Sequence, residues 1–150
     1  MAPPDGPVMD EESVIRLRNA VLRLARRLRT SGDPEGLTAT QSSVLSTLVR
    51  EGPVRAGDLA EAEALNPTLL SRILGHLEER GLVAREPDPE DRRATLARAT
   101  AAGRRLVERL RARRAALLLE WLQDISPEGR ASLLAALPAL EELVHEGRRA

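Results

Sequence analysis

Residues 66–98 restrict the fold of this chain more than any other stretch, because they join a short amphipathic helix directly to a charged hairpin. Four apolar residues recur at the i, i+3, i+4 and i+7 spacing of a single helix face: Leu70, Ile73, Leu74 and Leu77. This stripe predicts a helix that packs on a core along one side and faces outward along the other.

The residues at each end of this helix predict its boundaries. Asn66 is a good N-cap, Pro67 suits the first turn, and Gly81 can end the helix in a left-handed conformation. We therefore expect a helix over residues 66–80. The side chains that lie off its apolar stripe are mostly polar: Thr68, Leu69, Ser71, Arg72 and His76.

Two short alternating runs, LVARE and ATLAR, follow this helix and predict a β-hairpin. The segment between them, Pro87 to Arg93, contains no apolar residue except proline, so we expect the whole loop to project from the surface. A helix with a polar face beside an arginine-tipped hairpin matches the shape of duplex DNA. The helix can enter the major groove while an arginine reaches the backbone or the minor groove.

The segments before this stretch predict three further helices. Residues 11–29 carry an apolar seam at alternating three- and four-residue steps, which fits either an ordinary core helix or a dimer seam: Val14, Leu17, Val21, Leu24 and Leu28. Thr38 and Gln41 form a capping box before a helix whose buried face is Val44, Leu45, Leu48 and Val49. A short helix over Asp58–Leu65, anchored by Leu59, completes the helix-turn-helix order.

The segment after the hairpin predicts two long helices. Thr100 is a good N-cap for a helix that reaches about Gln123, and the run from Arg104 to Arg114 contains six arginines. These arginines could lie near DNA, pair with acids of a neighbouring helix, or be solvated. Ser126 begins the last helix, in which we expect Pro138 to cause a kink.

The charge is unevenly distributed, although the whole chain has a formal net charge of zero. Residues 66–114 contain 12 arginines and 7 acids, whereas residues 1–65 contain 8 against 10 and residues 115–150 contain 3 against 6. The net positive segment therefore includes the predicted hairpin, and local charge decides contact with phosphate.

Several classes of function are disfavoured. The chain has no cysteine and two distant histidines, which excludes thiol chemistry and argues against a metal site. We find no catalytic constellation, phosphate-binding glycine loop or cofactor motif, so we expect a protein that is not an enzyme. Without an apolar run of membrane-spanning length or a signal peptide, we expect a cytoplasmic location. The serious alternative to DNA binding is a winged helix that binds another protein, but the polar helix face and arginine-tipped loop favour DNA.

The run from Leu77 to Leu106 resembles the wing region of the MarR (multiple antibiotic resistance regulator) family. In that family, a leucine-rich helix ends at Gly-Leu-Val, and an Asp-x-Asp-Arg-Arg loop and a Thr-x-x-Gly helix start follow it. The matching residues here are Gly81-Leu82-Val83, Asp88 with Pro89-Glu90-Asp91-Arg92-Arg93, and Thr100 with Gly103. The resemblance covers residues 10–147 in element order and is dense in motifs from residue 58 to residue 103.

The resemblance implies a mainly α fold with a small β-hairpin wing. After a disordered tail at residues 1–9, residues 10–150 would form a single domain. Within it, a winged helix-turn-helix at about residues 38–99 would lie between dimerisation helices at about 11–29 and 100–147. The resemblance also implies a homodimer that binds a pseudo-palindromic operator in double-stranded DNA. A repressor is the usual case in the family, and many members respond to a small-molecule effector.

The candidate DNA contacts combine the helix face with the wing: Pro67, Thr68, Leu69, Ser71, Arg72, His76, Arg92 and Arg93. By the resemblance, Asp91 orients the wing tip, Arg93 meets DNA, and Arg92 contacts phosphate or a neighbouring helix. The alternative is a salt-bridged turn without a role in DNA binding. His76 is either a phosphate contact or a solvated side chain, and Leu69, where the family often has a polar residue, could touch a thymine methyl group.

Overall fold

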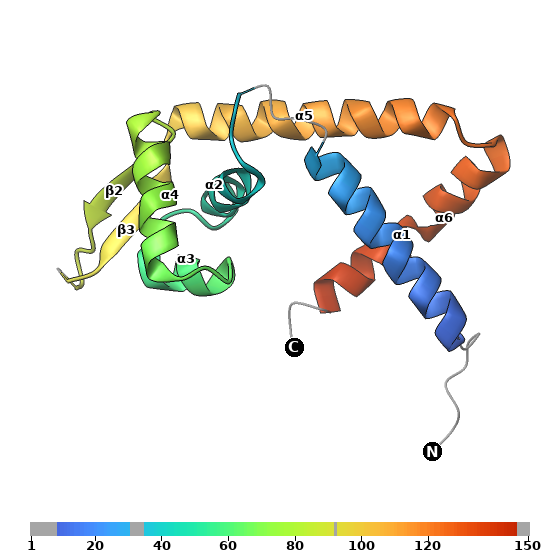
Figure 1. Cartoon of the computed structure of the whole chain (residues 1–150), viewed down its shortest axis with the longest axis horizontal. Coiled ribbons are helices and arrows are strands. Elements are labelled where there is room, and N and C mark those ends of the chain that lie inside the picture. Colours follow the sequence, from blue (N-terminus) through green and yellow to red (C-terminus); the bar gives the residue numbers. More distant parts are fainter. Residues whose placement is uncertain (1–8, 31–34, 92, 147–150) are drawn as a thin grey trace, which may run out of the picture. The chain divides into compact units, whose positions relative to one another are not determined.

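The computed structural model describes residues 9–30, 35–91 and 93–146, and α-helices predominate in it (Figure 1). The elements in chain order are α1 Glu11–Thr30, α2 Ala39–Glu51, β1 Val54–Arg55, α3 Ala56–Ala62, α4 Pro67–Glu79, β2 Val83–Pro87, β3 Thr95–Ala99, α5 Ala101–Gln123 and α6 Pro127–Glu146. The chain divides into two compact units, residues 1–111 and 112–150. The expected tail lies outside the described residues except for Met9.

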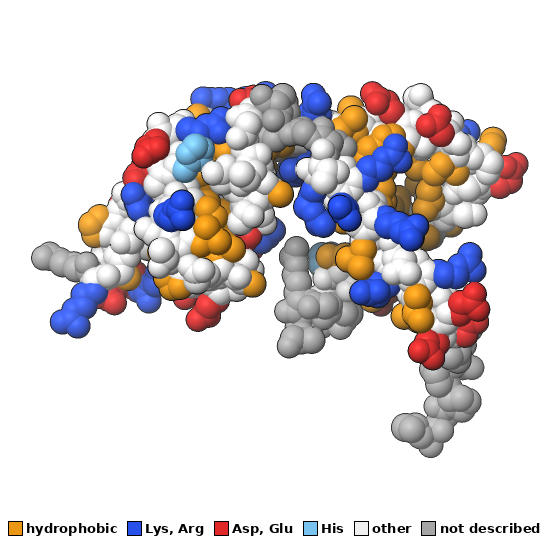
Figure 2. All heavy atoms as spheres, in the orientation of Figure 1, with side chains coloured by type: hydrophobic (Ala, Val, Ile, Leu, Met, Phe, Trp, Pro, Cys, Tyr) orange, Lys and Arg blue, Asp and Glu red, His pale blue; other side chains and the backbone are white. Residues whose placement is uncertain are grey.

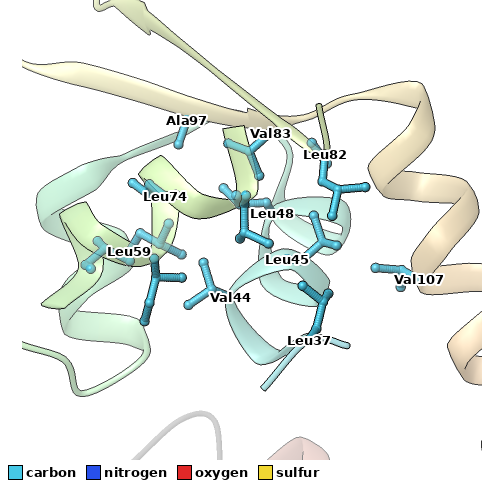
Figure 3. Packing of buried hydrophobic residues seen from close by; sticks show 14 of the residues in the cluster. Leu37, Val44, Leu45, Leu48, Leu59, Leu74, Leu82, Val83, Ala97 and Val107 are labelled. Carbon is cyan, nitrogen blue, oxygen red and sulfur yellow. The ribbon is translucent and has the colours of Figure 1, made fainter. Parts of the chain in front are cut away.

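The core of the first unit is built almost entirely from leucine, valine and alanine (Figure 3). α4 contributes the whole predicted stripe, in which Leu70, Ile73, Leu74 and Leu77 are all buried. Val44, Leu45 and Leu48 of α2 are also buried, as predicted, and Val49 packs against the core at partial burial. α4 contacts the hairpin on one side and α2 and α3 on the other (Figure 1).

The predicted helix caps are confirmed. Thr38 and Gln41 form the reciprocal capping box at the start of α2. The Asn66 side chain accepts a hydrogen bond from the backbone N–H of Leu69 at 2.8 Å, and Pro67 occupies the first turn of α4. Gly81 has φ +69°, and the N–H of Leu82 donates to the Leu77 carbonyl at 2.9 Å, which ends the helix sharply.

The sheet has one more strand than the sequence predicted. β2 and β3 form the expected hairpin, with Val83 opposite Ala99 and Pro87 opposite Thr95. The two-residue strand β1 pairs antiparallel with the other edge of β3, so that the strand order is β1-β3-β2. Two residues are too few to show an alternating pattern, and this strand is therefore visible only through its partner.

Hydrogen bonds and close packing of the segment from Thr100 to Gly103 connect the start of α5 to the base of the hairpin. The Thr100 hydroxyl donates to the Gly81 carbonyl at 2.7 Å and accepts from the N–H of Gly103 at 3.1 Å, which confirms its N-cap role. Gly103 packs so closely that a Cβ atom there would lie 2.2 Å from the Leu82 carbonyl oxygen. Glycine is therefore required by close approach at this position.

The prediction for the third helix was wrong at both ends. α3 spans Ala56–Ala62 rather than Asp58–Leu65. Arg55 precedes it in an extended conformation, and Ala64 has φ +52°, which turns the chain towards α4 before Leu65. The tight turn between α3 and α4 overrides the helical propensity of the run DLAEAEAL. Leu59 is fully buried, as expected.

The helices near the termini match their predicted bounds to within a residue or so. α1 has no buried residue, and several members of its apolar seam are exposed, including Val14, Val21 and Leu24. α6 continues through Pro138. At its N-terminus, the Ser126 hydroxyl accepts a hydrogen bond from the backbone N–H of Gly129 at 3.1 Å, as expected for an N-cap. The kink at Pro138 stays a prediction. None of the helices in the described ranges is long and apolar enough to cross a membrane.

Candidate nucleic-acid interface

The outer face of α4 combines small polar groups with one guanidinium. All six predicted positions of this helix are exposed: Pro67, Thr68, Leu69, Ser71, Arg72 and His76. They are exposed because the four apolar residues that alternate with them hold the opposite face on the core. The space-filling view shows arginine and histidine side chains over the region of α4 (Figure 2).

Arg72 and Arg80, the two arginines of α4 and its C-terminal end, differ in their hydrogen-bond partners. Arg80, at the C-terminal end of α4, donates to the main-chain carbonyl of Glu35 at 2.7 Å. For the guanidinium of Arg72, by contrast, the described residues provide no hydrogen bond and no ion pair. Its five N–H donors remain available for an external acceptor such as a guanine edge or a phosphate.

The wing loop is anchored by a buried carboxylate. Asp88 is only 3% exposed, and its Oδ2 accepts from Arg55 Nε at 2.5 Å while its Oδ1 accepts from the Glu90 N–H at 2.8 Å. These interactions hold the pKa of Asp88 below its usual value, chiefly through the Glu90 hydrogen bond and then through Arg55, against the opposing effect of burial. The Arg55 guanidinium also lies 3.6 Å from a Glu90 carboxylate oxygen.

The burial of Asp88 corrects the expectation that the whole loop projects. Asp88 is buried although the loop contains no apolar residue except proline. Its ion pair with Arg55 compensates for the hydration that the carboxylate loses. Asp88 belongs to the wing motif in the sequence, but its anchoring role and the role of Arg55 were not predicted. A family motif could mark Asp88, whereas no local signal identifies a partner 33 residues away.

The rest of the loop exposes its polar tip. Asp91 Oδ1 accepts from the backbone N–H of Arg93 at 3.0 Å, and the Asp91 carbonyl accepts from Ala94 at 2.8 Å. Asp91 thus constrains the backbone of the tip, whereas the guanidinium of Arg93 is exposed and has no partner in the part of the chain that is described. Arg92 lies outside the described residues.

A second ion pair joins the wing to α4. Arg85 of β2 donates from Nε and Nη2 to Glu78 Oε2, at 2.8 and 2.5 Å, and its backbone N–H lies 3.3 Å from Glu78 Oε1. The sequence pattern predicted no role for Glu78 or for Arg85. Their spacing of seven residues spans the turn at Gly81, so neither helix nor strand periodicity predicts the contact.

The arginines of α5 have different roles. Arg104 donates to the Ala99 carbonyl at 3.0 Å, and Arg109 pairs with Glu35 at 2.9 Å, so both stabilise the first unit. For Arg105, Arg111, Arg113 and Arg114, no ion pair occurs among residues 9–30, 35–91 and 93–146. A part of the arginine run is therefore structural, as one of the sequence alternatives proposed, although the acid lies in a loop rather than in a helix.

Comparison with known proteins gives one consistent result. The model of the MarR family matches residues 37–95. An uncharacterized HTH-type transcriptional regulator from Mycobacterium leprae is 35% identical over 127 residues, which cover 85% of this chain and 89% of that protein. The HTH-type transcriptional repressor MdtR from Bacillus subtilis is 28% identical over 98 residues, covering 65% of this chain and 63% of that protein. The structure is also similar to that of a putative transcriptional regulator from Pseudomonas aeruginosa. The TM-score is 0.74 at 32% identity, with 89% of this chain and 95% of that chain covered.

Proposed function

The chain belongs to the MarR family of DNA-binding transcriptional regulators, and from this we propose that it acts as a repressor that binds a pseudo-palindromic operator as a homodimer. In this proposal, the exposed face of α4 enters the major groove, and the arginines of the wing, Arg92 and Arg93, reach the minor groove or the backbone. Such a regulator acts in the cytoplasm.

The observation that carries the proposal is the pairing of the arginines on α4 and around the wing. Arg55 and Arg85 are occupied by the carboxylates of Asp88 and Glu78 and hold the wing in place. Arg72 on α4 and Arg93 on the wing have no such partner in the described ranges. Two free guanidiniums on adjacent elements suit a partner that offers phosphates and base edges at separate positions.

The homodimer is supported by the apolar side chains that the helices near the termini leave exposed. Val14, Val21 and Leu24 of α1 are 44–50% exposed, and Leu134 and Leu143 of α6 are 61–70% exposed. Helices with such faces are stable when a second chain covers them. A twofold protein places two copies of α4 on one duplex, which explains why a palindromic site is expected.

Repression is proposed because it is the usual activity in the family and because the similar MdtR is named a repressor. Release by a small-molecule effector stays a prediction based on the family. The alternative is a winged helix that binds a protein, which would require an apolar recognition face. Leu69 is the single large apolar residue among the six exposed positions of α4, and this argues for DNA.

Arg72→Ala tests the proposal most directly. An arginine that bonds to a guanine edge contributes about 1–3 kcal/mol of discrimination between bases. The probe is a duplex with the sequence that the wild-type protein enriches from a randomised pool, and the control is the same duplex scrambled. We expect Arg72→Ala to reduce the difference between the two affinities. An equal loss on both duplexes would make Arg72 a phosphate contact, and failure of the wild-type protein to enrich any sequence would contradict the proposed function.

A further inference from the structure

The tip of the wing and the face of α4 must be placed correctly with respect to each other if both are to contact one duplex. We propose that Glu78 and Arg85 are positioning residues for DNA binding, which form a clamp that holds the wing at a fixed distance from the recognition helix α4. The proposal rests on the proposed function and extends it to residues that do not touch DNA themselves.

The geometry of the pair suits a clamp rather than a chance surface contact. Both the Nε and Nη2 atoms of Arg85 bond to Glu78 Oε2, and the backbone N–H of Arg85 reaches the other carboxylate oxygen. A carboxylate held by the guanidinium and the main chain of the same residue is restricted in both position and rotation. The hydrogen bonds from Arg85 keep the pKa of Glu78 below its usual value, so that the carboxylate is charged at neutral pH.

The position of the pair in the fold makes it important for the wing. Of the residues in β2, Val83 is buried and Ala84 half-buried, whereas the strand is exposed from Arg85 onward. Arg85 is therefore the first exposed residue of β2, and it lies opposite the buried Ala97 of β3. Further out, the second anchor of the wing is Asp88, which binds Arg55 of β1 and makes no ion pair with α4.

A cavity of about 170 Å³ lies between the start of α3, the N-terminal half of α4 and the hairpin, and Gly57, Ser71, Arg85 and Thr95 are among its lining residues. Packing is therefore incomplete beside Arg85, and the Glu78–Arg85 pair is a polar link between α4 and β2 at this position. Loss of the pair would leave the wing free to vary in position, and DNA binding would have to restrict that motion again.

The principal test is Glu78→Gln, which keeps the size of the side chain and removes its charge. The matched control is Glu79→Gln, because Glu79 is an exposed neighbour on the same helix without an ion pair among the described residues. Affinity is measured on the duplex that the wild-type protein enriches from a randomised pool. We expect Glu78→Gln to weaken binding about three- to tenfold, Glu79→Gln to leave it nearly unchanged, and both proteins to melt close to the wild-type temperature.

The sign of the effect separates positioning from direct contact. If Arg85 were itself a DNA contact restrained by Glu78, then removing the negative charge would strengthen binding, and that result would overturn the proposal. Unchanged affinity for Glu78→Gln would also overturn it, while tight and selective binding by the wild-type protein would leave the proposed function intact.

A double-mutant cycle gives an independent readout that a purely structural role would not change. We expect Arg93→Ala to cost less affinity in the Glu78→Gln background than in the wild type, because a wing that is no longer positioned gains less from its tip arginine. The exchanged pair, Glu78→Arg with Arg85→Glu, should restore part of the lost affinity. Additive effects of Glu78→Gln and Arg93→Ala would contradict the clamp.

Discussion

The winged region and the helices near the termini use leucine in opposite ways. Every buried hydrophobic residue of the described chain lies between Leu37 and Leu110, within the segment that contains α2 to the first half of α5. α1 has no buried residue, and α6 leaves large apolar side chains exposed, with Leu134 at 70% and Leu143 at 61%. The winged region therefore has its own core, whereas α1 and α6 leave large apolar side chains exposed.

This difference indicates which kind of partner each region requires. The winged region exposes guanidiniums without partners at Arg72 and Arg93, which suit a polyanion. The other helices expose leucine and valine, which suit a second protein surface. Four substitutions test this contrast: Leu74→Ala, Leu134→Glu, Arg93→Ala and Asp91→Ala.

The largest effect is expected inside the closed core. Leu74→Ala should lower the free energy of unfolding by about 2–5 kcal/mol, because the side chain is 2% exposed and its removal leaves a cavity. Leu69→Ala on the same helix is the control, and since Leu69 is 39% exposed it should change the stability by less than about 0.5 kcal/mol. Urea unfolding measures both. Equal losses would mean that α4 does not pack on the core through the predicted stripe.

The next effect concerns the open faces. Leu134→Glu should weaken self-association by about 2 kcal/mol, roughly thirtyfold in the dissociation constant, because a charge would enter an apolar interface. Sedimentation at micromolar concentration should show a dimer for the wild-type protein and an increased monomer fraction for the variant. A wild-type protein that sediments as a stable monomer would contradict the proposed homodimer, since the exposed leucines of α6 would then lack the proposed partner.

The third effect is on the charged surface of the winged region. Arg93→Ala should lower operator affinity at least tenfold, about 1.4 kcal/mol, and leave the melting temperature nearly unchanged. If Arg93 contacts phosphate, the slope of log K against log salt should become shallower by about one unit for each chain bound. Arg105→Ala removes the same charge from α5, and we expect it to cost less affinity than Arg93→Ala if the position of the wing arginine matters and not the charge alone. An Arg93→Ala protein with wild-type affinity would contradict this account of the wing.

The smallest effect should come from Asp91→Ala. Asp91 restrains the backbone of the tip through its hydrogen bond to the Arg93 N–H, and its removal leaves the guanidinium in place. We expect the operator affinity to fall about threefold, roughly 0.7 kcal/mol, which is less than for Arg93→Ala. A fluorescence titration at several salt concentrations would show an unchanged slope if Arg93 still makes its contact. A greater loss than for Arg93→Ala would mean that Asp91 does more than orient the tip.

The sequence predicted the helices, their caps and the hairpin because these features depend on residues a few positions apart. The stripe of α4, the capping box of α2 and the left-handed Gly81 are all set within one or two turns of chain. The motifs at the wing further identified the family. By contrast, β1 and the bounds of α3 were not predicted correctly, because pairing with β3 and the turn at Ala64 override weak local preferences.

Local sequence patterns are therefore sufficient to predict which segments are helical, which face of each helix is apolar, and where the basic hairpin lies. Which arginines are paired with an acid depends instead on the packing of distant elements. Arg55 pairs with Asp88, 33 residues away in sequence, and Arg85 pairs with Glu78 across the turn at Gly81. Arg72 and Arg93 form no ion pair among the described residues. An arginine has the same sequence signature in each case. Its role is decided by the distance to a carboxylate, and that distance is fixed by how the core packs the elements together.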